Sequence, residues 1–250
     1  MPETPGYRTA LVTGASRGVG AEIVKALIAE GLEVWALARP SDALDALAAE
    51  TGCHKLQADL NDDAALATVL DGLEIDILVN NAGVISAVKP FVDVTALEAD
   101  AMLSTNLRAP IRVTSTLLPG MIARQRGHIF AITSIFGPYA GPNVAVYCAT
   151  KAAIRSFCAC LRIDLAGTGI RVTEIAPGRT ETSIYLDAMG GDQETLEDKL
   201  FNKFRVLQPE DVAQALIAAL RLPARADANI IELSPTDQAA GGAVFAERDT

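Results

Sequence analysis

Seven short runs of aliphatic and β-branched residues recur along the chain, and glycine, asparagine, aspartate or other polar residues bound them. The runs cover residues 9–13, 34–38, 54–58, 75–80, 128–133, 171–176 and 229–233. Short apolar runs between turn-forming residues are typical of buried strands. The pattern therefore predicts seven strands.

Longer stretches rich in alanine and leucine separate the predicted strands, and their apolar residues recur at helical spacing. They cover residues 19–30, 43–50, 62–70, 109–124, 144–166 and 209–220. Strands that alternate with helices, and are too apolar to face water on either side, favour a parallel sheet covered by helices on both faces. We therefore expect an α/β fold, a doubly wound Rossmann-type domain whose seven-stranded, mainly parallel sheet has the order 3-2-1-4-5-6-7.

The length of the chain fits one domain. α/β domains of this size are common, and no linker-like stretch divides residues 1–250. Residues 181–205 depart from the alternation, because they mix Gly190-Gly191 with many charges and scattered apolar residues. This segment is predicted to be a mobile lid or substrate loop.

The charge balance narrows the function classes. The chain has 21 lysines and arginines against 31 aspartates and glutamates, a formal net charge of −10. A protein with this negative charge repels phosphate backbones and anionic membrane surfaces. Nucleic-acid and membrane partners are therefore not expected. The sequence begins without a basic segment followed by an apolar one, and no apolar run is long enough to span a membrane. We therefore expect a cytoplasmic protein.

Cysteines and histidines offer little chemistry for a site. The two histidines, His54 and His128, each lie beside a predicted strand, and they are too few to predict a metal site or a histidine-based triad. The cysteines form no C-x-x-C pair, and we interpret them as buried free thiols. They are Cys53, Cys148, Cys158 and Cys160.

A glycine-rich turn follows the first predicted strand. Residues 13–20 read T-G-A-S-R-G-V-G and lead directly into a helical pattern. Glycines at these places permit a tight turn, a close approach of the backbone to a pyrophosphate and close packing of helix on sheet, while the helix N-terminus attracts the phosphate charge. Taken alone, the turn fits a packing turn or another phosphate loop equally well, although a P-loop would need Gly-Lys-Ser/Thr.

Four further motifs follow in a fixed order. They are Asn80-Asn81-Ala82-Gly83 at the end of the fourth predicted strand, Asn106 in the following helix, Ser134 at the end of the fifth strand, and Tyr147-Cys148-Ala149-Thr150-Lys151 as Y-x-x-x-K. With the T-G-x-x-x-G-x-G turn, their order and spacing resemble the short form of the short-chain dehydrogenase/reductase family over residues 8–182. Pro177-Gly178 and Thr182 also match, whereas Arg179-Thr180 replaces the family's more usual residue-then-aliphatic pair.

Tyr147 and Lys151 are four residues apart in a helical stretch, so they share one face about one turn apart. An ordinary tyrosine pKa of ~10 is too high for a base at neutral pH, but an adjacent cation and an oxidised nicotinamide ring both favour the phenolate. Tyr147 can then exchange a proton with an alcohol or carbonyl oxygen while hydride moves to or from the nicotinamide. Ser134, at a strand end, can hold the same oxygen. Each residue alone has a structural interpretation, a turn former or a chance helical pair, and their shared register favours catalysis.

The resemblance implies further roles. Lys151 would also bind the nicotinamide ribose, and Asn106 would hold a water that links Lys151 to solvent. Asp59-Leu60, after the third predicted strand, would meet the adenine ring, although Asp59 also fits a helix cap. The residues implied in cofactor binding are Gly14, Ser16, Arg17, Gly18, Val19, Gly20, Ala38, Arg39, Asp59, Leu60, Asn81, Ala82, Gly83, Tyr147, Lys151, Pro177, Gly178, Thr180 and Thr182.

The end of the second predicted strand bears on the choice of cofactor. An acidic residue there would bind the adenosine 2′-hydroxyl, whereas a 2′-phosphate is repelled by a carboxylate and favours arginine. Ala38 stands where the acid would be, Arg39 follows it, and Arg17 lies in the glycine turn. Either arginine alone could be merely solvated, but together with the missing acid they predict NADP(H) rather than NAD(H).

The end of the sequence bears on the substrate. Residues 230–238 read I-I-E-L-S-P-T-D-Q instead of a final V-D-G-G segment, and they resemble the subgroup acting on 3-hydroxy acids, serine-like amino acids and small sulfonated alcohols. Arg179 is a candidate partner for an anionic substrate, for the cofactor phosphates or for Glu181. We expect an oxidoreductase that interconverts a secondary or primary alcohol, such as a small polar hydroxy acid, and its carbonyl compound.

Two alternatives and an assembly remain as hypotheses. A non-catalytic dinucleotide-binding sensor can share this fold, but we would expect such a protein to have other residues at the positions of Tyr147 or Lys151. An epimerase or dehydratase of the extended form would show T-G-x-x-G-x-x-G and a larger substrate domain, and the sequence shows neither. The resemblance implies a homodimer or homotetramer packed through the helices at 109–124 and 144–166, whose small residues allow close approach.

Overall fold

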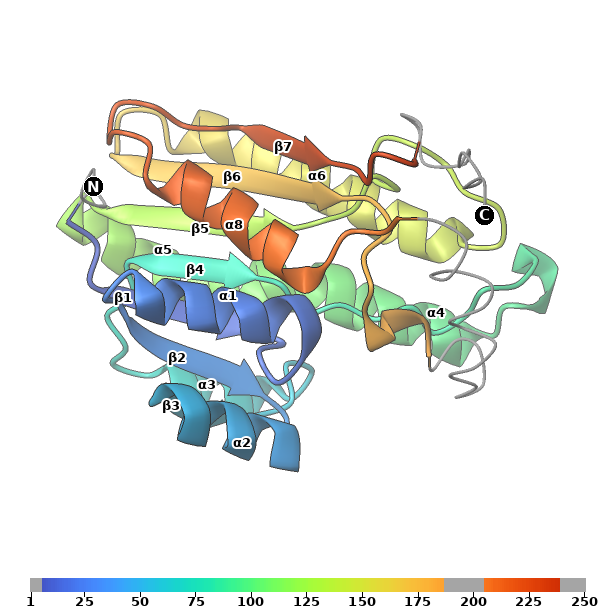
Figure 1. Cartoon of the computed structure of the whole chain (residues 1–250), viewed down its shortest axis with the longest axis horizontal. Helices are drawn as coiled ribbons and strands as arrows, with labels where there is room; N and C mark the ends of the chain where they lie inside the picture. The colour runs from blue at the N-terminus through green and yellow to red at the C-terminus, as the bar shows by residue number, and fades with distance from the viewer. Residues whose placement is uncertain (1–5, 187–204, 239–250) are drawn as a thin grey trace.

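Parallel pairing organises the chain around one sheet. In the computed structural model, which describes residues 6–186 and 205–238, seven strands lie in the order β3-β2-β1-β4-β5-β6-β7 and every neighbouring pair is parallel (Figure 1). The strands are β1 (Thr9–Thr13), β2 (Glu33–Ala38), β3 (His54–Gln57), β4 (Ile77–Asn80), β5 (Gly127–Ile132), β6 (Ile170–Pro177) and β7 (Ile230–Leu233). The expected order is confirmed, and each predicted strand is present with ends shifted by at most two residues.

Helices cover both faces of the sheet, as predicted. One face carries α1 (Gly18–Ala29), α2 (Asp42–Thr51) and α8 (Pro209–Leu220). The other face carries α3 (Asp63–Leu70), α5 (Ala109–Arg124) and α6 (Ala145–Asp164). The described residues therefore form a single Rossmann-type domain.

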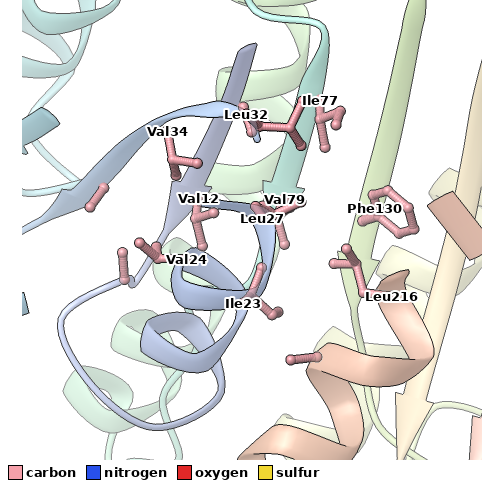
Figure 2. Packing of buried hydrophobic residues seen from close by; sticks show 14 of the residues in the cluster. Val12, Ile23, Val24, Leu27, Leu32, Val34, Ile77, Val79, Phe130 and Leu216 are labelled. Atoms are coloured by element: carbon pink, nitrogen blue, oxygen red, sulfur yellow. The ribbon is translucent and has the colours of Figure 1, made fainter. Parts of the chain in front are cut away.

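Two apolar layers hold the sheet between its helices. Successive residues of β1 point to opposite faces, so Val12 packs in the layer beneath α1 and α8, while Leu11 packs in the layer beneath α5 and α6. Figure 2 shows the first layer, where Phe130 of β5 lies beside Leu216 of α8. Both side chains are fully buried, which stabilises the fold by roughly 1.5–3 kcal/mol each. The carboxyl edge of the sheet is thus a rigid platform.

One helix was not among the predicted ranges. α4 (Ala96–Leu103) continues through a π-helical turn, η2 (Ser104–Arg108), directly into α5. A capping box begins it, because the Thr95 hydroxyl accepts from the Glu98 backbone N–H and the Glu98 carboxylate accepts from the Thr95 N–H at 2.8 Å. Leu97 is 80% exposed, so the apolar residues of α4 do not follow one buried face. Because α4 has no buried apolar stripe, the spacing of apolar residues in the sequence does not predict it.

The expectation of buried thiols holds for two of the four cysteines. Cys53 and Cys158 are buried, Cys148 is half-buried and Cys160 is exposed, all of them unpaired. Cys160 is exposed because it lies two residues after the buried Cys158 on α6 and so faces away from the sheet. The described residues contain no group of histidine, cysteine and acidic side chains that could hold a metal ion.

The histidines have structural surroundings. His128 is fully buried on β5, and its Nε2 lies 2.8 Å from the Thr173 hydroxyl in a hydrogen bond. Burial holds the pKa of His128 well below its ordinary value, so the ring is neutral. His54 stacks on Trp35 and contacts Glu33 at the exposed edge strand.

Most of the predicted lid, residues 187–204, lies outside the described residues. On the described side, β6 is followed by a short 3₁₀ turn, η3 (Ser183–Tyr185). The lid therefore stays a prediction. Within the described ranges, no helix is long and apolar enough to cross a membrane.

Candidate active site

The candidate residues gather at the carboxyl edge of the sheet. β1 pairs with β4, β4 with β5 and β5 with β6, so the segments that follow these four strands lie side by side. Those segments carry the glycine turn, Asn81, Ser134 and Gly178. Parallel pairing thus assembles motifs that are far apart in the sequence, at the edge where such folds bind ligands.

The glycine turn is closed by contacts that only glycine permits. Gly14 has φ +63°, and a Cβ there would lie 2.7 Å from the Cα of Ala82. A Cβ on Gly20 would lie 2.3 Å from the Gly14 carbonyl oxygen and 2.6 Å from Asn81 Nδ2. Asn81 Nδ2 donates to the carbonyls of Thr13 and Gly14 at 3.0 and 3.1 Å. The N-N-A-G segment therefore braces the turn directly.

Thr13 is a supporting residue that the sequence analysis did not single out. Its hydroxyl accepts from the backbone N–H groups of Asn81 and Ala82 at 3.1 and 3.2 Å and donates to the Val79 carbonyl. The neighbouring Asn80 donates its side-chain amide to the Thr114 hydroxyl on α5 at 3.0 Å. Thr13 is the first residue of the glycine motif, and this position in the sequence could have identified it as a supporting residue.

The N-terminus of α1 fits an anionic group. Arg17 stands at the N-cap and makes no side-chain capping bond, and the first turn holds no acidic residue. The first amide groups of a helix lack intrahelical acceptors and carry partial positive charge. The Thr182 side chain lies 3.6 Å from the place that a Cβ on Gly18 would take, so Thr182 closes over this end. A pyrophosphate is the group such a cradle suits.

The end of β2 lies beside the glycine turn, because Thr13 pairs with Leu37. Ala38 is buried there, and Arg39 and Arg17 are both exposed. In the part of the chain that the structure describes, the guanidinium groups of Arg17 and Arg39 make no hydrogen bond or ion pair. Both guanidinium groups are therefore available to a phosphate.

Asp59 forms a turn ahead of α3. Its side-chain Oδ1 accepts from the Asn61 backbone N–H at 2.9 Å, and its carbonyl accepts from the Asp62 N–H. Asp62, and not Asp59, is the N-cap of α3. Ser16, Val19 and Leu60 are half-buried at the same edge. Adenine contact by Asp59 and Leu60 stays a prediction.

Tyr147, Lys151 and Ser134 come together as predicted. Tyr147 and Lys151 lie on the first turns of α6, 6% and 5% exposed, and the Lys151 ammonium lies 5.6 Å from the centre of the Tyr147 ring. The Ser134 side chain lies close enough to the Tyr147 phenol to lower its pKa. Lys151 Nζ donates to the Ile132 carbonyl at 3.0 Å, which fixes the ammonium over the end of β5.

The charge state of Tyr147 differs from the expectation that the adjacent lysine favours phenolate. Burial raises the pKa of Tyr147 well above its ordinary value, Tyr185 raises it further, and the Ser134 side chain only partly opposes this. Burial also lowers the pKa of Lys151 to about 8, against the opposing attraction of Glu174. Desolvation is the largest influence on the Tyr147 pKa, so the protein by itself holds a neutral phenol. A neutral phenol is a proton donor.

Asn106 joins this group from the π-helical turn η2. Its Oδ1 accepts from the Val84 N–H at 2.8 Å, and its Nδ2 donates to the Val84 carbonyl and to the Thr150 hydroxyl. A Cβ on Gly83 would lie 3.5 Å from both Asn106 Oδ1 and Lys151 Nζ. The bare glycine therefore lies between the two polar groups. The Asn106 side chain has a structural role, and the water implied by the resemblance stays a prediction.

The segment after β6 brings a cation to the site. The Gly178 N–H donates to the Leu233 carbonyl at 2.7 Å, and the Arg179 N–H donates to Gln238 Oε1 at 2.9 Å. A Cβ on Gly178 would lie 2.4 Å from that same oxygen. The buried Thr180 turns its hydroxyl onto the Gly178 carbonyl, so its cofactor contact stays a prediction.

Tyr185 interacts electrostatically with both Arg179 and Tyr147. Burial lowers the pKa of Arg179, and its charge lowers the pKa of Tyr185 against a larger increase from burial. Tyr185 in turn raises the pKa of Tyr147. Tyr185 packs with Tyr147 and Ile85 in a small apolar cluster at the carboxyl edge. The site thus combines a proton donor, an apolar wall and a partly desolvated cation.

Comparison with known proteins gives consistent results. The family model described as short chain dehydrogenase matches residues 8–189. An uncharacterized short-chain type dehydrogenase/reductase of Sinorhizobium fredii is 44% identical over 95% of each chain. An NADP-dependent 3-hydroxy acid dehydrogenase of Salmonella typhi is 36% identical over 93% of this chain and 96% of its own. The closed form of a serine dehydrogenase complexed with NADP+ has a TM-score of 0.90 at 35% identity, over 96% of this chain and all of that one.

Proposed function

This chain belongs to the short-chain dehydrogenase/reductase family, and we propose that it interconverts a small hydroxy acid and its carbonyl compound by NADP(H)-dependent hydride transfer. The carrying observation is that Tyr147, Ser134 and Lys151 meet, buried, at the carboxyl edge of the sheet. An oxidoreductase acting on CH–OH groups requires such a proton donor beside a place for the nicotinamide.

The residues at this edge fit the cofactor. The turn at Gly14 and Gly20 has no room for side chains and leads to a helix N-terminus without a competing acid, which suits a pyrophosphate. Ala38 leaves room without a carboxylate, and Arg17 and Arg39 offer charge to a 2′-phosphate. We assign the remaining cofactor contacts to the segments after β3, β4 and β6 and to Lys151.

Proton transfer by Tyr147 follows from its neutral state. When bound, NADPH would supply the hydride for the carbonyl carbon. The Tyr147 phenol would donate its proton to the carbonyl oxygen. Ser134 holds that oxygen by a hydrogen bond. The phenolate left behind is stabilised by the ammonium of Lys151, which carries its charge below a pKa of about 8. Oxidation of the alcohol reverses these steps.

The position and surroundings of Arg179 support the proposal that the substrate carries a carboxylate. It follows β6 directly, its backbone is fixed on both sides by Gln238 and Leu207, and its charge reaches the tyrosine beside Tyr147. A partly desolvated guanidinium binds a carboxylate more strongly than an exposed one does. The relatives named above as 3-hydroxy acid and serine dehydrogenases support the same substrate class.

We also propose a homotetramer or homodimer in the cytoplasm. The outward faces of α5 and α6 expose Ile111, Ile122 and Ile163, and the last of these is 76% exposed. Exposed apolar side chains on two adjacent helices favour burial against a second copy. The unpaired cysteines support a reducing compartment.

A substrate panel tests the function. With NADP+, the nicotinamide absorbance should rise on adding 3-hydroxy acids or serine, and less with neutral alcohols of equal size. Arg179→Leu should lower kcat/KM for the acids roughly ten- to a hundred-fold, the equivalent of ~1.5–3 kcal/mol for a hydrogen bond to a charged group, and leave neutral alcohols unchanged. Arg225→Leu, an exposed arginine at the opposite edge, is the control. Cofactor binding without turnover of any alcohol or ketone would favour the sensor.

Tyr147→Phe removes only the transferable proton. Turnover should be lost while NADPH binding, followed by fluorescence, persists. Tyr139→Phe, at an exposed tyrosine before α6, should keep wild-type kcat. Lys151→Ala should reduce both kcat and NADPH affinity, because Lys151 is proposed to contact the ribose and support the phenol. If Tyr147→Phe retains more than about a tenth of kcat, a loss below ~1.4 kcal/mol, the assignment of Tyr147 is wrong.

Cofactor preference should follow the charge at the end of β2. Arg39→Ala should weaken NADPH binding roughly ten- to a hundred-fold, for a lost charge-assisted contact of ~1.5–3 kcal/mol, and change NADH binding little. Ala38→Asp should add repulsion of the phosphate and a partner for the ribose diol of NADH, and both changes together should invert the preference. Arg8→Ala, at the exposed amino edge, is the charge-matched control. Equal weakening of both cofactors by Arg39→Ala would contradict this interpretation.

Light scattering tests the assembly. The mass in solution should be two or four times that of one chain, and Ile163→Glu should shift it toward the monomer, because a charge would then be buried at the proposed contact. Leu97→Glu, at an exposed leucine of α4 outside that contact, is the control. A wild-type protein that is monomeric at all concentrations would exclude the proposed assembly.

A further inference from the structure

A carboxylate lies buried behind the catalytic helix. Glu174, in the middle of β6, is 0% exposed, and it lies on the face of the sheet that α6 covers. Its Oε1 accepts from the Thr133 hydroxyl at 2.8 Å. Val172, two residues earlier on the same face, packs in the apolar layer. An acidic side chain in such a layer costs free energy unless nearby groups stabilise its charge.

The partners of this carboxylate do not fully compensate its charge. Arg155 of α6 brings its Nη1 to 3.6 Å from Glu174 Oε1, within ion-pair distance but beyond a good hydrogen bond. Arg155 Nη1 and Glu174 Oε2 are buried, and neither has a hydrogen-bond partner in the described part of the chain. The negative charge therefore still acts on other groups nearby, because the surroundings are apolar and screen it weakly.

The end of β5 links Glu174 to the catalytic lysine. Lys151 Nζ donates to the carbonyl of Ile132, and Glu174 accepts from the side chain of the next residue, Thr133. Lys151 and Arg155 are four residues apart on α6, so both lie on the helix face toward the sheet. The ammonium and the carboxylate thus contact consecutive residues, the last residue of β5 and the one that follows it.

We propose that Glu174 is a positioning residue that keeps Lys151 positively charged and anchored over the end of β5. The proposal rests on the proposed function, because it assigns a task to the ammonium beside Tyr147. Glu174 touches neither substrate nor cofactor and acts only through Lys151.

The electrostatics of the lysine support this role. Burial lowers the pKa of Lys151 to about 8, and Glu174 is the group that raises it. Other titratable or charged groups around the pair are Tyr147, Cys158 and Arg155 on α6, Arg179 and Tyr185 after β6, and Glu232 on β7. None of these is a counter-ion of Lys151 equivalent to Glu174, because Glu232, the other carboxylate, is exposed. Without Glu174 the lysine would lose its proton nearer neutral pH.

The test is the pH dependence of kcat/KM for NADPH, which reports groups of the free enzyme. Wild type should lose activity on the alkaline side as Lys151 deprotonates, near a pKa of about 8. Glu174→Gln keeps the size and hydrogen-bonding capacity of the side chain and removes the charge. It should move the alkaline limb down by about 1 pH unit, the size of effect expected of a nearby charge. NADPH affinity, measured by fluorescence, should fall at the same lower pH.

Matched variants separate this role from a merely structural one. Glu232→Gln removes a carboxylate from the same face of the sheet, where water screens it, and should leave the limb in place. If Glu174→Gln alone fails to fold, Glu174→Gln with Arg155→Gln removes both buried charges and leaves none unpaired. That double variant should shift the limb in the same downward direction but by less, because the like charge of Arg155, one turn from Lys151, is lost as well.

The proposal is overturned if the Glu174→Gln limb coincides with the wild-type limb, or if Glu232→Gln shifts the limb equally. A loss of activity that is uniform across pH, with a lowered Tm, would also overturn it, because that result indicates structural damage only. Failure of the proposed function is distinguishable, since it would appear as retained turnover in Tyr147→Phe whatever Glu174→Gln does.

Discussion

Parallel pairing of all seven strands sends every strand-to-helix segment to one edge of the sheet. β1 lies between β2 and β4, and β5 lies between β4 and β6, so segments separated by dozens of residues become neighbours. In this chain those segments carry the glycine turn, Asn81, Ser134 and Gly178. No single stretch of sequence holds the site. The register of the sheet assembles it, and the two apolar layers keep that register fixed.

The glycine turn and the space beside Lys151 depend on residues that have no side chain. Gly14 and Gly20 let the turn close against Ala82 and Asn81, and Gly83 leaves space between Asn106 and Lys151. The side-chain amide of the half-buried Asn81 and the hydroxyl of the buried Thr13 then satisfy the backbone groups of the tight turn. These contacts hold the turn at the α1 N-terminus in a conformation that suits a phosphate group.

The protonation states of Tyr147 and Lys151 depend on desolvation. Burial favours the neutral forms of both Tyr147 and Lys151, which raises the pKa of the phenol and lowers that of the ammonium. A neutral phenol suits proton donation to a carbonyl oxygen, whereas a neutral lysine would no longer stabilise the phenolate that follows. The site therefore needs Tyr147 as a neutral phenol and Lys151 as a charged ammonium. Buried Glu174 provides the negative charge that the lysine requires.

The sequence by itself determined the seven strands, six of the helices on the two faces and the register of the catalytic motifs. Those features depend on short-range periodicity and on spacing within one element, such as the single helical turn between Tyr147 and Lys151. Only the tertiary structure decided the direction of the Tyr147 pKa, because that depends on burial by residues far away in the chain. It also decided α4, whose exposed Leu97 hides the pattern, and the place of Glu174, an acid in an otherwise apolar strand. The physical reason is the same in each case: desolvation and through-space charge are set by neighbours that only folding brings together.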